Sequence, residues 1–129
     1  MRGSTLVEFA LLLPFLFVLT FLVVDLSRAF GFKNLVSQAS REGARFAAVT
    51  SINAPDSLQT RAARRAQVIL GGSYVRCVAA PVTGASDNIQ VTVDGRFNWL
   101  YPGLIKWIGI TGLTNPDTLT ATTVMRWER

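Results

Sequence analysis

The first 25 residues are dominated by one long apolar run. Residues 6–24 read LVEFALLLPFLFVLTFLVV, and Glu8, Pro14 and Thr20 are the exceptions to the apolar pattern. A helix of this length rises about 28 Å, close to the ~30 Å hydrocarbon thickness of a bilayer. The pattern therefore predicts one membrane-spanning helix over residues 4–25.

A cleaved secretory signal is the competing interpretation of this run. Such a signal needs small neutral residues at a cleavage site that follows the apolar core. Here the run is followed by VDLSRAFGFKN, which places Asp25 and Arg28 in that region. We therefore favour a retained span over a cleaved signal.

Helical spacing continues well beyond the apolar run. Apolar and small residues, with one lysine, recur every three or four positions: Leu26, Ala29, Phe30, Lys33, Val36, Ala39, Gly43, Phe46 and Ala47. The other side of the same helix is expected to carry Asp25, Arg28, Ser37, Gln38, Arg41, Glu42 and Arg45. This periodicity predicts one continuous helix from about residue 5 to about residue 49.

Ala39, Gly43 and Ala47 form a stripe of small residues at a spacing of four. A glycine in an exposed helix interior costs ~1 kcal/mol relative to alanine. Its presence is better explained by another element approaching the helix backbone closely. We therefore expect these three residues to be helix-packing positions.

The remainder of the chain predicts one short helix and then strands. The helix has a buried face of Leu58, Ala62, Ala66 and Ile69 or Leu70, and Gly71-Gly72 ends it. Alternation of period two then predicts strands at residues 74–80, at 89–99 with Ile89, Val91, Val93, Phe97 and Trp99 on one face, and at 119–127 with Leu119, Ala121, Thr123, Met125 and Trp127 on one face.

The connection LYPGLIKWIGITGLTNPD is unusually apolar. It is interpreted as a short helix, a lid over the core or a surface that dips into lipid headgroups. Helices followed by strands predict an α+β fold, in which a small antiparallel sheet of about three strands packs on the upper half of the long helix.

Composition argues against several classes of function. The 129 residues hold 13 Lys and Arg against 8 Asp and Glu, a net charge of +5, and the basic residues are scattered rather than clustered. Histidine is absent and Cys77 is the single cysteine, which favours a small buried side chain over a functional thiol. We expect no enzyme activity, cofactor, metal site, small-molecule substrate or nucleic-acid partner.

Charge counting leaves the membrane orientation open. Arg2 precedes the span, whereas Arg28 and Lys33 follow it. Taken alone, this count would place the C-terminal side in the cytoplasm.

Three segments carry a resemblance to a known family. They are GSTLVEFA at residues 3–10, Arg41-Glu42-Gly43-Ala44-Arg45 on the long helix, and TATTVMR at residues 120–126. Together with the apolar run, they resemble the TadE-like family of pseudopilins, which take part in the assembly of type IV pili of the tight-adherence (Flp) systems of bacteria.

The resemblance implies a processing site and a topology. A prepilin peptidase would cut after Gly3, which makes residues 1–3 a leader and Ser4 the first mature residue. The N-terminus would be cytoplasmic, and residues 26–129 would form a pilin-like domain that is exported across the inner membrane to the periplasm or into the pilus. Phe9, where major Flp pilins usually carry Tyr, fits a minor subunit. The implied partners are the inner membrane, other pilins and pseudopilins, the assembly platform and the peptidase.

Cleavage would also give Glu8 a partner. The new α-amine of Ser4 is largely protonated at neutral pH. Ser4 and Glu8 are four residues apart, so ammonium and carboxylate lie on one helical face, about 6 Å apart along the axis. We expect Glu8 to pair with the ammonium of a neighbouring subunit; the alternative is a carboxylate that merely reaches the interfacial water.

Two other functions stay open at this point. One is a single-pass membrane-anchored extracytoplasmic binding domain that never enters a filament. The other is a secreted enzyme behind an atypical signal, which the missing histidine and the lone cysteine disfavour.

Overall fold

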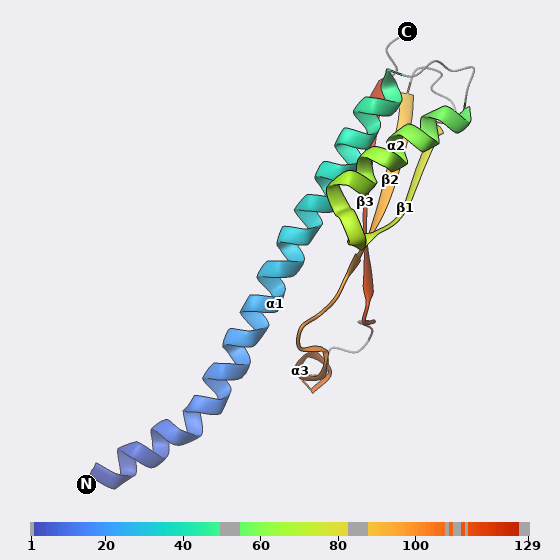
Figure 1. Ribbon diagram of the computed structural model, residues 1–129. Helices are drawn as coiled ribbons and strands as arrows, with labels where there is room; N and C mark the ends of the chain where they lie inside the picture. The colour runs from blue at the N-terminus through green and yellow to red at the C-terminus, as the bar shows by residue number, and fades with distance from the viewer. Residues whose placement is uncertain are drawn as a thin grey trace.

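The computed structural model describes residues 2–49, 55–82, 88–107, 109, 112 and 114–126. Its elements are α1 (Arg2–Ala48), α2 (Pro55–Leu70), the 3₁₀ turn η1 (Gly71–Ser73), β1 (Tyr74–Pro81), β2 (Asn88–Phe97), α3 (Pro102–Trp107) and β3 (Asp117–Arg126). The predicted α+β fold is therefore confirmed: a long N-terminal helix, a short helix and a three-stranded antiparallel sheet (Figure 1).

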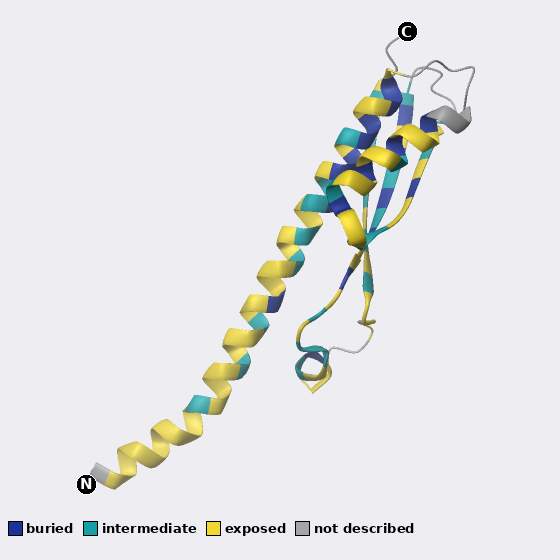
Figure 2. Cartoon of the chain, in the orientation of Figure 1, coloured by how far each residue is buried: buried dark blue, intermediate teal, exposed yellow. Residues whose placement is uncertain are grey.

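α1 is one continuous helix that runs past Pro14, as the periodicity predicted. Its second half packs under the domain, and its first half projects away from it (Figures 1 and 2). The predicted inner face is only partly right. Val36, Ala39 and Ala47 are fully buried, whereas Leu26 and Phe30 are 47% and 65% exposed.

The buried face of α1 is also broader than the predicted stripe. Ser40, Ala44 and Ala48 are buried as well. The reason is that two elements flank this half of the helix, since α1 contacts both α2 and the β2–β3 part of the sheet. Two flanking elements cover a wider arc of a helix than one does.

α2 packs across α1 by the face that its spacing predicted. Leu58, Ala62, Ala66 and Leu70 are all buried. The helix begins with Pro55, whose fixed φ suits the first helical position. It passes into η1 at Gly71, where φ is +54°, a conformation that glycine adopts without strain.

The sheet has the order β1-β2-β3, with antiparallel pairing throughout. Cys77 is paired with Val93, and Val93 with Ala121, so one row of residues crosses all three strands on the inner face. The predicted inner face of β2 is confirmed, because Ile89, Val91, Val93 and Phe97 are buried. The strand ends at Phe97, so Trp99 lies beyond it, and Trp127 lies outside the described residues.

The molecule therefore has two layers, with α1 and α2 covering the inner face of the sheet (Figure 1). The core between the layers combines small residues of the helices with β-branched residues of β2. The apolar connection after β2 contains α3, which lies beside α1 at the end of the domain nearest the N-terminal half of the helix (Figure 1). This confirms the short-helix interpretation of that segment.

Candidate functional site: the exposed half of α1 and its junction with the domain

The N-terminal half of α1 exposes large apolar side chains along its whole length (Figure 2). Those exposed by half or more are Leu6, Val7, Phe9, Leu11, Leu12, Phe15, Leu16, Phe17 and Val23. Monomeric soluble proteins rarely expose a contiguous apolar surface of this size. The helix is long and apolar enough to cross a membrane, and it fits a single-pass membrane anchor.

Gly3, Ser4 and Glu8 lie at the exposed N-terminal end of this helix. Ser4 Oγ lies 3.5 Å from Glu8 Oε1, so the two residues share one face, as their spacing predicted. The peptide bond between Gly3 and Ser4 is inside the first turn of α1, which begins at Arg2. A peptidase that cuts there would have to unwind that turn.

The stripe of Ala39, Gly43 and Ala47 faces the interior of the domain. Ala39 and Ala47 are fully buried. A Cβ built on Gly43 would lie 3.4 Å from the carbonyl oxygen of Ala62 on α2 and 3.4 Å from Val91 Cγ1 on β2. The stripe therefore lies against α2 and the sheet of the same chain, which leaves the other faces of α1 to meet other molecules.

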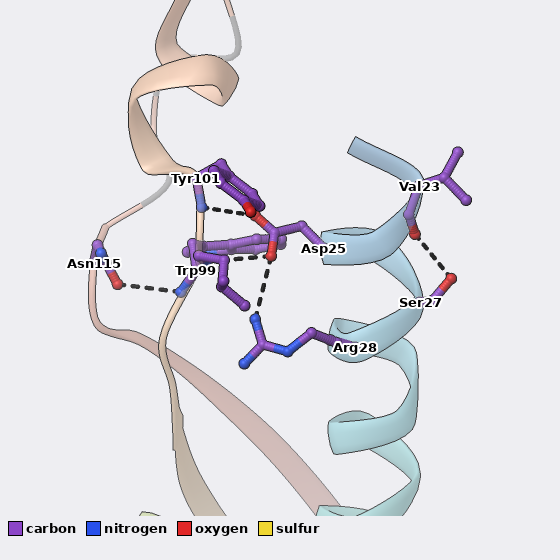
Figure 3. A network of polar contacts seen from close by, with 8 residues as sticks. Val23, Asp25, Ser27, Arg28, Trp99, Tyr101 and Asn115 are labelled. Carbon is purple, nitrogen blue, oxygen red and sulfur yellow. Dashed lines mark hydrogen bonds and ion pairs between the residues drawn. The ribbon is translucent and has the colours of Figure 1, made fainter. Parts of the chain in front are cut away.

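Asp25 is the residue that the sequence pattern placed wrongly. It was expected on the solvated side of α1, but it is only 2% exposed. Its Oδ2 accepts a hydrogen bond from the Tyr101 backbone N–H at 2.9 Å, and its Oδ1 accepts one from the Leu100 N–H at 3.2 Å (Figure 3). These donors come from the connection after β2, which no local pattern could place beside residue 25.

The Arg28 guanidinium completes the surroundings of the Asp25 carboxylate. Arg28 Nη1 lies 3.2 Å from Asp25 Oδ1, and its side chain is 44% exposed. The same guanidinium lies over the Phe97 ring, 5.5 Å from its centroid. A buried carboxylate that accepts three donors is well satisfied. Asp25 therefore fastens the start of α3 to the end of the apolar half of α1.

Aromatic contacts extend this junction toward the N-terminus. The Phe21 ring lies 4.7 Å from the Tyr101 ring, and Phe17 stacks near Phe21 at 6.3 Å. On the other side of the junction, Phe97 contacts Trp99 edge to face at 5.0 Å. The domain thus touches the predicted span itself, four residues before Asp25.

Cys77 lies on the edge strand β1, faces the core and is 2% exposed, the small buried side chain that composition favoured. Burial, with a smaller contribution from the Asp94 carboxylate, raises the pKa of its thiol to about 11. A thiol in that state is a poor nucleophile. Within the described ranges, no three Asp, Glu or Cys side chains are placed to hold a metal ion.

Comparison with known proteins finds a similarity over the N-terminal part of the chain. A family model described as TadE-like protein matches residues 3–45. Neither the curated proteins nor the solved structures gave a match. The matched range contains Gly3, Ser4, Glu8, Asp25 and Gly43, and it covers nearly all of α1. Over residues 3–45 the chain is therefore similar to the TadE-like family, the family that the motifs along the helix resemble.

Proposed function

We propose that this protein is a minor pseudopilin that takes part in the assembly of a tight-adherence (Flp) pilus. The observation that carries the proposal is α1 itself: one unbroken helix whose apolar half is largely exposed and whose other half holds a folded domain. The match to the TadE-like family over the same helix supports it.

In this proposal the exposed half of α1 lies first in the lipid bilayer and later among the helices of other pilins. It first spans the inner membrane with its N-terminus in the cytoplasm and its domain in the periplasm. It then packs against the helices of other pilins when the assembly platform lifts the subunit. Because the Ala39–Ala47 stripe is already covered by α2 and the sheet, contacts between subunits use the apolar surface of residues 4–24.

Glu8 is proposed to set the register of that packing. Once the peptidase has cut after Gly3, the Ser4 ammonium and the Glu8 carboxylate lie one turn apart on one face. Both lose water when helices surround them, and an unpaired charge in an apolar environment is costly by several kcal/mol. Pairing Glu8 with the ammonium of a neighbour removes that cost.

The Glu8→Gln variant tests the proposal. Membrane insertion should be as good as that of the wild type, since a charge is removed, but incorporation into pili should fall sharply. The matched control is Glu42→Gln, the same change on the packed half of α1, which should leave piliation unchanged. Pili are counted per cell at equal protein levels. Normal piliation with Glu8→Gln would contradict the pairing and favour a carboxylate that only reaches water.

Processing and topology are measured separately. Intact mass from strains with and without the peptidase should differ by the residues up to Gly3. An alkaline phosphatase fused after Arg129 should be active. An unprocessed chain that is correctly exported would instead favour the membrane-anchored binding domain that never enters a filament.

A further inference from the structure

The segment Leu100–Trp107 contains α3 and exposes apolar and aromatic side chains. Trp107 is 79% exposed and Leu100 is 51% exposed. Lys106, between them, is also exposed, whereas Ile105 is buried. A tryptophan, a tyrosine and a lysine in one short segment are the residues that anchor proteins at the level of lipid headgroups.

The segment is held against α1 at its start. The backbone N–H groups of Leu100 and Tyr101 are bound by Asp25, and the Tyr101 ring packs on Phe21 (Figure 3). These contacts fix the height of the segment along α1. Asp25 is the first residue after the apolar run, so the segment begins where the predicted span ends.

From that point the segment runs toward the N-terminal end of α1. Its last residue, Trp107, lines a groove of about 560 Å³ whose other walls are Leu11, Pro14, Phe15, Val18, Leu19 and Leu22 of α1. Along a helix, residues 11–22 cover about 16 Å. Trp107 therefore lies beside the apolar run and not beyond it.

We propose that Leu100–Trp107 inserts into the lipid leaflet at the C-terminal end of the α1 span, with phospholipid acyl chains filling the groove beside Trp107. The argument for lipid as the occupant is continuity: the groove is part of the surface that fits a membrane anchor. Arg28, which follows the apolar run and has a 44% exposed side chain, would meet phosphate at the level of the headgroups, and the long side chain of Lys106 would extend toward the same level. The segment thereby holds the domain at a fixed height and angle on the membrane.

The polar backbone groups of Leu100–Trp107 limit how deeply this segment can insert into the membrane. Gly109 N–H donates to the Lys106 carbonyl at 3.1 Å and Leu104 N–H to the Tyr101 carbonyl at 3.2 Å, but a six-residue helix satisfies few of its end groups within itself. Such groups favour water or headgroups, so the start of the segment at Leu100 stays at the interface and Trp107 at its end reaches the acyl chains. The inference rests on the membrane span alone and needs no pilus.

Tryptophan quenching in vesicles of phosphatidylcholine and phosphatidylglycerol tests it. The full chain is reconstituted with no other protein, in lipids brominated near the headgroup end of the acyl chains. Replacing Trp107 with phenylalanine (Trp107→Phe) should remove at least about half of the quenching, because an exposed tryptophan beside lipid is accessible to bromine. The Trp127→Phe change, at a tryptophan that follows β3, should leave the quenching almost unaltered. Since Trp107 is exposed, its replacement does not disturb the core.

A second variant separates this inference from the membrane anchor. In the Trp107→Phe background, Phe9→Trp places an indole on an exposed part of the span outside the groove, where bromine on the acyl chains should quench it. Quenching there, with none that depends on Trp107, would overturn the inference and leave the anchor intact. Blue-shifted Trp107 emission that bromine does not quench, and that weakens as protein is diluted in lipid, would overturn it in favour of a second copy covering the groove.

Discussion

Gly95 of β2 lies directly against Val36 of α1. A Cβ built on Gly95 would come within 2.8 Å of Val36 Cγ2 and 3.0 Å of Phe32 Cζ, closer than real Cβ atoms approach other atoms. Val36 is fully buried and β-branched, so it has little freedom to move away. Because Gly95 has no side chain, α1 and β2 approach each other more closely at this point than any other residue would allow.

The Gly95→Ala variant should be destabilised by ~1–3 kcal/mol, because the added methyl group overpacks a filled core. Alanine otherwise suits a strand better than glycine, so the sign of the effect is diagnostic. Thermal unfolding of the full chain in detergent, followed by near-ultraviolet circular dichroism, measures it. Gly31→Ala is the control, since a Cβ there meets nothing within 4 Å. A Gly95→Ala protein as stable as the wild type would show that the layers can separate slightly.

The stability of the fold should depend on the size of the side chain at residue 43 rather than on its mere presence. A Cβ at this position meets Ala62 and Val91 at 3.4 Å, which is close but not prohibitive. Gly43→Ala should be nearly neutral, because a gain in helix propensity of up to ~1 kcal/mol offsets the tight contacts. Gly43→Leu should cost ~1–3 kcal/mol by overpacking. Gly31→Leu, on the exposed side of the same helix, should be neutral or stabilising; equal effects at the two glycines would contradict the packing.

Asp25→Asn should loosen the attachment of α3 to α1. The amide group of asparagine presents a donor to a site that holds only donors, so a backbone N–H of Leu100 or Tyr101 loses its acceptor. An unsatisfied buried group of this kind costs ~1–3 kcal/mol. Hydrogen exchange of these two amides, measured in lipid nanodiscs, should accelerate by about 10-fold to 100-fold. Asp117→Asn, where the carboxylate accepts from its neighbour Thr118, is the control and should leave exchange at residues 100–101 unchanged.

Ionisation of the Cys77 thiol should lower the stability of the folded chain at alkaline pH. Its pKa is about 11 in the folded chain, above the ~8.5 of an exposed thiol. Between these values the unfolded chain has released the proton while the folded chain keeps it, so stability falls as pH rises. The loss should approach ~3 kcal/mol above pH 11. Cys77→Ala should be less stable at neutral pH but should show a shallower decline, and parallel declines for both proteins would refute the account.

The sequence pattern predicted the elements well and the long-range contacts poorly. The period of 3.6 predicted α1 and α2, and the period of two predicted the inner face of β2, because each depends on neighbours within one element. Asp25 escaped prediction because its two backbone hydrogen-bond donors lie 75 and 76 residues away. Gly95 was missed because a glycine in an alternating strand gives no sign of which helix will pack on it.

At the candidate site, too, the local features were predicted from the sequence and the long-range contacts were not. Gly3, Ser4 and Glu8 were found from a short motif beside an apolar run, and their roles remain predictions. Leu26 and Phe30 were expected to be buried because they fit the helical stripe, yet they are exposed. The domain covers the opposite side of α1 at that level, where Asp25 meets the connection that leads to α3.

The position of β3 sets a condition on how the protein can be made. β3 is the last strand along the chain, yet Lys33 Nζ donates to the carbonyl of Thr120, and Ser40 Oγ lies 2.7 Å from Thr123 Oγ1. The core on α1 therefore cannot close until residues 117–126 have been synthesised and have reached residues 26–48 of the helix. A chain stalled before that moment presents the bare edge of β2, open to pairing with any extended segment nearby. Synthesis and docking of the last strand are thus the step that ends the vulnerability of the nascent chain to aggregation and proteolysis.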